Sequence, residues 1–108
     1  MITSHPIAAD ALLSGLPGEA LVRQGLADRR ADRVSIESCL VEIASPRLER
    51  AGLLDGNQAE TEPERALYRL LRQSGGDAYS RYNSLLRELV SFEHALDHRL
   101  RRAGDSST

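Results

Sequence analysis

Apolar residues recur along this chain at helical spacing. Ile36, Cys39, Leu40 and Ile43 follow the i, i+3, i+4, i+7 spacing of a buried helix face, and Ser35 stands where it would cap that helix. No run of β-branched residues alternates with polar residues in the way that predicts a half-buried strand. The pattern therefore predicts an all-α fold in which Cys39 is a core residue.

Glycine, proline and capping residues divide the chain into segments. They predict helices over residues 6–14, 17–31, 36–44 and 46–51, and a loop over residues 53–60. Gly25 lies among apolar residues inside the second of these helices, where the lack of a side chain allows a neighbouring helix to approach closely.

The next helix has the clearest start in the sequence. Thr61 stands at the cap position, and Glu64, three residues later, completes a capping box. The helix should end at Ser74, because Gly75 follows as a C-terminal stop.

Only Gly75 and Gly76 separate that helix from Asp77, which we expect to cap a last helix reaching about Arg102. Helices joined by so short a connection form an antiparallel hairpin. The sequence thus predicts a small helical bundle of about five helices that ends in an antiparallel hairpin with a long C-terminal helix. We expect a single helical domain over residues 1–103 and a flexible tail over 104–108.

The apolar residues of this last helix form a wide stripe. Its seam has the heptad spacings 4, 3, 4, 3 and 4, over Ala78, Tyr82, Leu85, Leu89, Phe92 and Leu96. Leu86, Val90 and Leu100 widen the stripe to roughly 160°, more than a two-stranded contact needs. The helix is also about twice as long as its hairpin partner, so either the N-terminal helices or a second copy of the chain must cover the remainder. We expect a helical bundle whose long helix also supports a homodimer. The residues predicted for this interface are Tyr82, Leu86, Leu89, Val90, Glu93, Leu96 and Leu100.

Glu93 falls inside the apolar stripe, where a carboxylate needs a partner. Arg29 is the first candidate for a buried ion pair with Glu93, and Arg47 and Arg69 are others. Such a pair would fix the register of two helices more than it would add stability. The alternative, a general acid or base, has no nucleophile or metal partner in the sequence that would define a reaction.

His94 and His98 are four residues apart, a spacing that can place two imidazoles on one metal ion. Both project about 100° or more from the centre of the apolar stripe, and the sequence indicates no third ligand. We therefore expect a solvated face and no metal or cofactor. A ligand or metal site near Glu93, His94 and His98 stays open as an alternative.

The charge composition argues against a nucleic-acid module, which normally carries a strong positive excess. The net charge is −2, and all 14 basic residues are arginine, a bias typical of GC-rich bacterial genomes. In outline, residues 35–52 resemble a helix-turn-helix with Arg47 and Arg50 in the second helix, but that helix is too short for base recognition. A small DNA-associated regulatory protein is therefore an alternative, and nucleic acid is not the expected partner. That alternative would also use two arginine clusters, provided that they meet in space: Arg23, Arg29, Arg30 and Arg33, and Arg99, Arg101 and Arg102.

The remaining motifs point to an intracellular protein without catalysis. A single cysteine cannot form an intramolecular disulfide, the first residues lack signal-peptide features, and no apolar run is long enough to span a membrane. The chain shows no nucleophile–base set and no glycine-rich nucleotide loop. We expect a cytoplasmic protein that is not an enzyme, has no membrane contact, and acts as an interaction or structural module, as a homodimer and through contact with another protein.

Overall fold

Six helices form the regular structure of the computed structural model, which describes residues 9–54 and 62–106; no strand occurs within these ranges. The helices are α1 (Ala9–Leu13), α2 (Glu19–Arg30), α3 (Ile36–Ile43), α4 (Ser45–Arg50), α5 (Pro63–Gln73) and α6 (Ala78–Ser106). The predicted all-α class and the long C-terminal helix are confirmed. Each of the six helical segments that the sequence predicts forms within the described ranges, including the short helices α1 and α4, in agreement with a bundle of about five helices.

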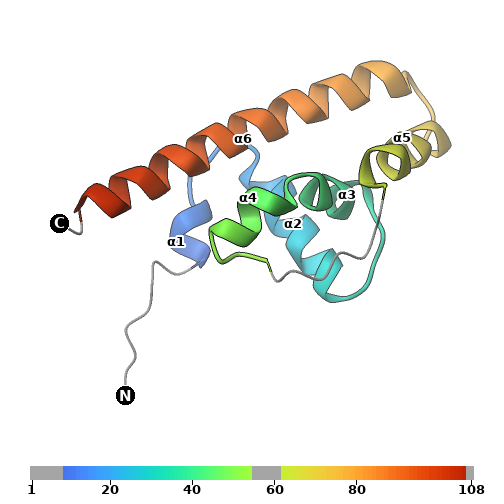
Figure 1. The fold of residues 1–108 in the computed structure, drawn as a ribbon. Coiled ribbons are helices and arrows are strands. Elements are labelled where there is room, and N and C mark those ends of the chain that lie inside the picture. Colours follow the sequence, from blue (N-terminus) through green and yellow to red (C-terminus); the bar gives the residue numbers. More distant parts are fainter. Residues whose placement is uncertain (1–8, 55–61, 107–108) are drawn as a thin grey trace.

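The arrangement is dominated by α6, which runs along one side of all the other helices (Figure 1). At about 1.5 Å per residue this helix is roughly 43 Å long. α5 folds back against its N-terminal part, so the predicted α5–α6 hairpin is confirmed, and α1 lies against its C-terminal half. None of the helices in the described ranges has the length and apolar character needed to cross a membrane.

α3 is the central helix of the core and packs against α2, α4, α5 and α6. Cys39, Leu40 and Val41 on this helix are fully buried, which confirms the prediction that Cys39 is a core residue. Phe92 and Leu96 of α6 close the same core from the other side. The core is thus mostly aliphatic, and the fold holds α6 through contacts along much of its length.

α2 and α3 cross closely at Gly25. A Cβ atom added there would lie 2.3 Å from the carbonyl oxygen of Glu37 and 2.5 Å from Cγ2 of Val41. No real Cβ atom approaches a neighbour so closely, so this crossing requires glycine. The close approach predicted at Gly25 is confirmed.

Two predicted helix caps are present. The Ser35 hydroxyl accepts a hydrogen bond from the backbone N–H of Ser38 (3.0 Å), and the Ser38 hydroxyl accepts one from the backbone N–H of Ser35 (2.8 Å), which completes a capping box for α3. At the start of α6, Oδ1 of Asp77 accepts a hydrogen bond from the backbone N–H of Ser80 (3.1 Å). Side-chain oxygens in these places satisfy N–H groups that have no partner within the helix.

Other helix ends differ from prediction. α5 begins at Pro63 with Glu62 at the cap position and no side-chain cap, so the box predicted from Thr61 and Glu64 is wrong by one residue; Thr61 itself lies outside the described residues. α2 begins at Glu19 rather than at Pro17, because Gly18 adopts a left-handed conformation (φ 78°) at the cap position.

The end of the last helix and the start of the first helix can also be compared with their predicted positions. α6 continues to Ser106, so the tail expected from residue 104 is helical over its first three residues, while residues 107 and 108 lie outside the described ranges. The predicted start of the first helix, near residue 6, lies outside them as well.

Candidate interaction surface

Part of the predicted interface on α6 is used inside the chain itself. Leu89 is 5% exposed and Leu96 is 0% exposed, because α1, α3 and α5 pack on this side of the helix. These two residues therefore cannot contact a second copy, and the prediction is wrong for them. Tyr82, Leu86 and Leu100 are half-buried against the core.

Val90 is the predicted interface residue that stays exposed, at 47%. With Leu86, one helical turn earlier, it lines an open hollow on α6 whose other members are polar. We call this surface the α6 strip: Asn83, Leu86, Arg87, Val90 and Ser91. It holds one charged residue among five, the composition expected for the centre of a protein interface rather than for a solvated face.

A second surface lies on α5. Its side chains line an open hollow of about 480 Å³. We call it the arginine face: Arg65, Tyr68, Arg69, Arg72 and Gln73. The three arginines have the spacing i, i+4 and i+7, which places them on one side of the helix, opposite the fully buried Leu67 and Leu71.

The arginine face carries positive charge that the described part of the chain does not neutralise. Arg65 pairs with Glu62 at 3.1 Å, but both side chains are mostly exposed, and such a pair contributes little. Arg69 and Arg72 make no side-chain hydrogen bond or ion pair with any residue, and both are exposed in the described structure.

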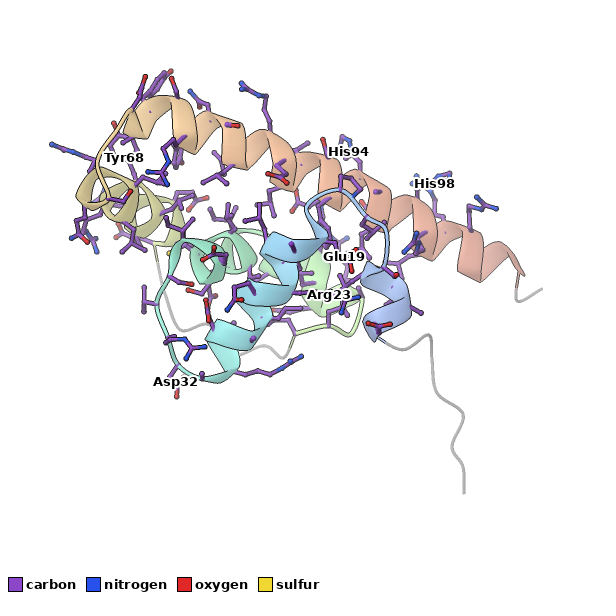
Figure 2. All side chains as sticks on the ribbon, turned by 180° about the vertical axis from the view of Figure 1, so that it is seen from behind. Glu19, Arg23, Asp32, Tyr68, His94 and His98 are labelled. Carbon is purple, nitrogen blue, oxygen red and sulfur yellow. The ribbon has the colours of Figure 1, made fainter. Side chains whose placement is uncertain are left out.

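Tyr68 joins the arginine face to α6. Its ring meets the ring of Tyr82 edge to face, with centroids 5.6 Å apart and an interplanar angle of 82°. Figure 2 shows Tyr68 where α5 lies beside the N-terminal part of α6. This contact fixes the position of the tyrosine, so one border of the arginine face is rigid.

Glu93 is partly buried, and its partner is Arg47 on α4. Nε of Arg47 lies 3.7 Å from Oε2 of Glu93, and the same guanidinium pairs with Asp97 one turn further along α6. The predicted pair between Glu93 and Arg29 is wrong, and Arg47, the second candidate, takes its place.

Arg29 instead forms an ion pair between α2 and α3. Its Nε lies 2.9 Å from Oε2 of Glu42, and the two side chains are only 10% and 3% exposed. Glu42 falls beside the apolar stripe of α3, so the hydrophobic pattern does not mark it as a buried partner. Arg29 therefore fixes the α2–α3 register rather than the position of α6.

His94 and His98 project from α6 away from the other helices (Figure 2), and both are exposed. The described part of the chain contains no group of three or more His, Cys, Asp or Glu side chains that could hold a metal ion. The exposure of both imidazoles agrees with the predicted solvated face.

Several arginines of the DNA hypothesis are engaged in the fold, whereas Arg30 and Arg101 are exposed. Nη1 of Arg99 donates hydrogen bonds to three backbone carbonyls at the C-terminal end of α1, those of Ala11, Leu12 and Ser14, at 3.1, 3.0 and 2.6 Å. Arg47, which this hypothesis places in a recognition helix, is paired with acids of α6, and α4 has only six residues. The segment over residues 35–52 therefore does not present a recognition helix of the usual length.

The two clusters also lie apart. Asp32, next to the arginines at the C-terminal end of α2, is far from His98 and the C-terminal part of α6 in Figure 2. Arg23, at the other end of its cluster, forms ion pairs with Glu19 at 2.7 Å and with Asp10 at 2.9 Å.

The carboxylates of Glu19 and Asp28 stabilise turns rather than form an acid–base site. The backbone N–H of Gly15 and the guanidinium of Arg23 lower the pKa of Glu19. Hydrogen bonds from the Ser35 hydroxyl, Arg33 and Gln24 lower the pKa of Asp28. Each carboxylate is held in its charged form by neighbours that join one helix to the next, so neither is poised for acid–base chemistry.

The arginine face was missed because acidic residues at the start of the same helix balance its charge in the sequence. The i, i+4, i+7 spacing of its arginines was the signal that could have found it. Comparisons of this chain with protein-family models, with curated proteins and with solved structures find no match.

Proposed function

We propose that this protein is an interaction module of the bacterial cytoplasm rather than an enzyme, and that it forms a homodimer through the α6 strip. The observation that carries this proposal is the exposure of Val90, beside the half-buried Leu86, near the middle of the longest helix. The other helices cover the apolar residues on one side of α6 and leave these two accessible.

A twofold symmetric pairing would bury these side chains. In such a dimer the same patch of both copies meets itself, so Leu86 and Val90 of one copy would face the strip of its partner. Asn83 and Ser91 can form hydrogen bonds at the edge of this contact, and Arg87 can extend into solvent. The contact is small, and we expect a weak dimer.

The test is the mass in solution, measured by light scattering over a range of protein concentrations at about 50 and about 500 mM NaCl. We expect the mass to rise toward twice the 11.9 kDa of one chain. Because the strip has apolar residues at its centre and no pair of opposite charges, added salt should not weaken the contact. A mass of 11.9 kDa at every concentration would contradict the proposal.

Two variants locate the contact. Val90→Glu places a charge in the α6 strip and should return the mass to that of a monomer. His94→Glu places the same charge one turn further along α6, at an exposed position outside the strip, and should leave the dimer intact. A dimer that survives Val90→Glu would place the interface elsewhere.

A further inference from the structure

The geometry points to a second binding surface: we propose that the arginine face of α5 binds an acidic helical segment of another protein, with carboxylates at the same i, i+4, i+7 spacing. This inference rests on the proposed role as an interaction module but not on the homodimer, since the arginine face and the α6 strip have no residue in common.

Part of the positive charge on the arginine face has no partner within the described chain. Within the described chain, Arg69 and Arg72 are exposed and make no side-chain hydrogen bond or ion pair, and they lie within one turn of each other on α5. The other arginines that lack a side-chain partner in the described structure are Arg30 at the end of α2, and Arg87 and Arg101, which are far apart on α6. The arginine face is thus the place where several accessible guanidinium groups gather.

The arginines of this face are also regularly spaced along α5. Arg65 and Arg72 are seven residues apart, about 10.5 Å along the helix axis. A partner helix with acidic residues at the same spacing presents its carboxylates at the same interval. The planar guanidinium group can donate two parallel hydrogen bonds to each carboxylate, which favours arginine over lysine for such recognition.

Tyr68 and Gln73 add an aromatic ring and an uncharged hydrogen-bonding group to the arginine face. Tyr68 is half-buried and held by its edge contact with Tyr82, so binding would cost it little side-chain entropy. Tyrosine and arginine are also the residue types that contribute most at the centres of protein interfaces. Gln73 borders the opposite side and offers both a donor and an acceptor.

The extent of the positive surface favours a short acidic segment over a nucleic acid. Glu62 and Glu64 stand at the start of the same helix, directly before Arg65, and interrupt the positive charge there. The whole chain has a net charge of −2. A nucleic-acid strand presents continuous phosphates and requires a longer basic track than these three arginines provide.

The experiment is fluorescence anisotropy of a fluorescein-labelled, alanine-rich helical peptide that carries three glutamates at the i, i+4, i+7 spacing, at about 50 mM NaCl. The second probe is the same peptide with glutamine at those positions, and the third is a short DNA duplex. We expect saturable binding of the glutamate peptide at least about tenfold tighter than that of the other two probes.

The double variant Arg69→Gln/Arg72→Gln should weaken binding of the glutamate peptide by about tenfold or more. The matched control is Arg30→Gln/Arg101→Gln, which removes the same charge from two exposed arginines outside the arginine face. The control should bind within about twofold of the unmodified protein. Circular dichroism checks that both variants keep the fold.

Three results would overturn the inference. Equal losses in the two double variants would indicate attraction by net charge alone, and equal binding of the glutamate and glutamine peptides would remove the role of carboxylates. Tighter binding of DNA, lost in Arg69→Gln/Arg72→Gln, would identify a nucleic-acid surface. The mass of Arg69→Gln/Arg72→Gln by light scattering reports the homodimer separately, so one proposal can fail without the other.

Discussion

Single residues determine how closely the central helices of this protein pack, and Gly25 is the clearest case. In an exposed helix, replacing glycine by alanine stabilises by about 1 kcal/mol, because alanine is the better helix former. At Gly25 the added Cβ would overlap backbone and side-chain atoms of α3. Local propensity and packing therefore predict opposite signs.

We expect Gly25→Ala to lower the free energy of unfolding by about 1 to 3 kcal/mol, since α2 and α3 must move apart. Urea unfolding followed by circular dichroism measures this change. The control is Ala27→Gly at an exposed position of the same helix, which should cost about 1 kcal/mol through propensity alone. A higher unfolding midpoint for Gly25→Ala would mean that α2 and α3 do not cross so closely.

Two helix caps could be predicted from the sequence, whereas the ion pairs between helices could not. Ser35 and Asp77 cap their helices as predicted, because a cap depends on the next three residues alone. The partner of Glu93 was misassigned, since the choice between Arg29 and Arg47 depends on whether α2 or α4 faces that part of α6. Periodicity in one helix contains no such information.

The connection between α2 and α3 shows how one carboxylate joins two elements. Asp28 accepts hydrogen bonds from the Ser35 hydroxyl at 2.7 Å, from Arg33 at 2.9 Å and from Gln24 at 2.9 Å. These bonds lower the pKa of Asp28, and Ser35 also caps α3. One charged group thus connects the end of α2 with the start of α3.

The lowered pKa of Asp28 predicts a pH dependence. A carboxyl group whose pKa is lower in the folded than in the unfolded state stabilises the fold above the unfolded pKa, near about 4 for aspartate. This stability is lost as the pH falls through the folded pKa. Asp28→Asn should therefore lower the melting temperature at pH 7, and its difference from the unmodified protein should shrink toward pH 2.

Melting temperatures from pH 2 to pH 7 test this prediction, with Asp32→Asn as the control. Asp32 is exposed, its side chain makes none of these hydrogen bonds, and its φ of 56° suits asparagine. The control should differ little from the unmodified protein. A deficit in Asp28→Asn that stays constant with pH would show that the charge on Asp28 does not stabilise the turn.

Most helix boundaries in the described chain were predictable to within about two residues, but α6 continues four residues beyond its predicted end at Arg102. Gly52 and Gly75 end helices as expected, because a positive φ at these positions suits glycine. The start of α5 was misplaced by one residue, since Glu62, Pro63 and Glu64 are all suitable for a first turn and the sequence does not decide among them.

At the scale of the whole molecule, the sequence left open what covers the long helix. The wide apolar stripe on α6 predicted contact with several neighbours, from the N-terminal helices or from a second copy, and helices α1, α3 and α5 bury much of it within one chain. Val90 and part of Leu86 remain accessible to a second copy. A stripe shows that a helix is covered, and it does not distinguish coverage by the same chain from coverage by another.

Cys39 offers a direct measure of how cooperatively the molecule unfolds. It is the only cysteine, is 1% exposed, and lies on α3, which four other helices surround. We expect a thiol reagent to modify it more than about a thousandfold more slowly in the native protein than in the unfolded chain, because access requires global unfolding. The modification rate followed by absorbance, as a function of urea, measures this.

If access requires global unfolding, the logarithm of the modification rate should rise with urea at the same slope as the logarithm of the unfolding equilibrium constant. Gly25→Ala should then speed modification by the factor that its lost stability predicts. A shallow slope would instead reveal local opening around α3. The same reaction also bears on the proposed homodimer. A dimer that binds only folded chains adds stability by mass action, so modification should slow as protein concentration rises, and Val90→Glu should abolish that dependence.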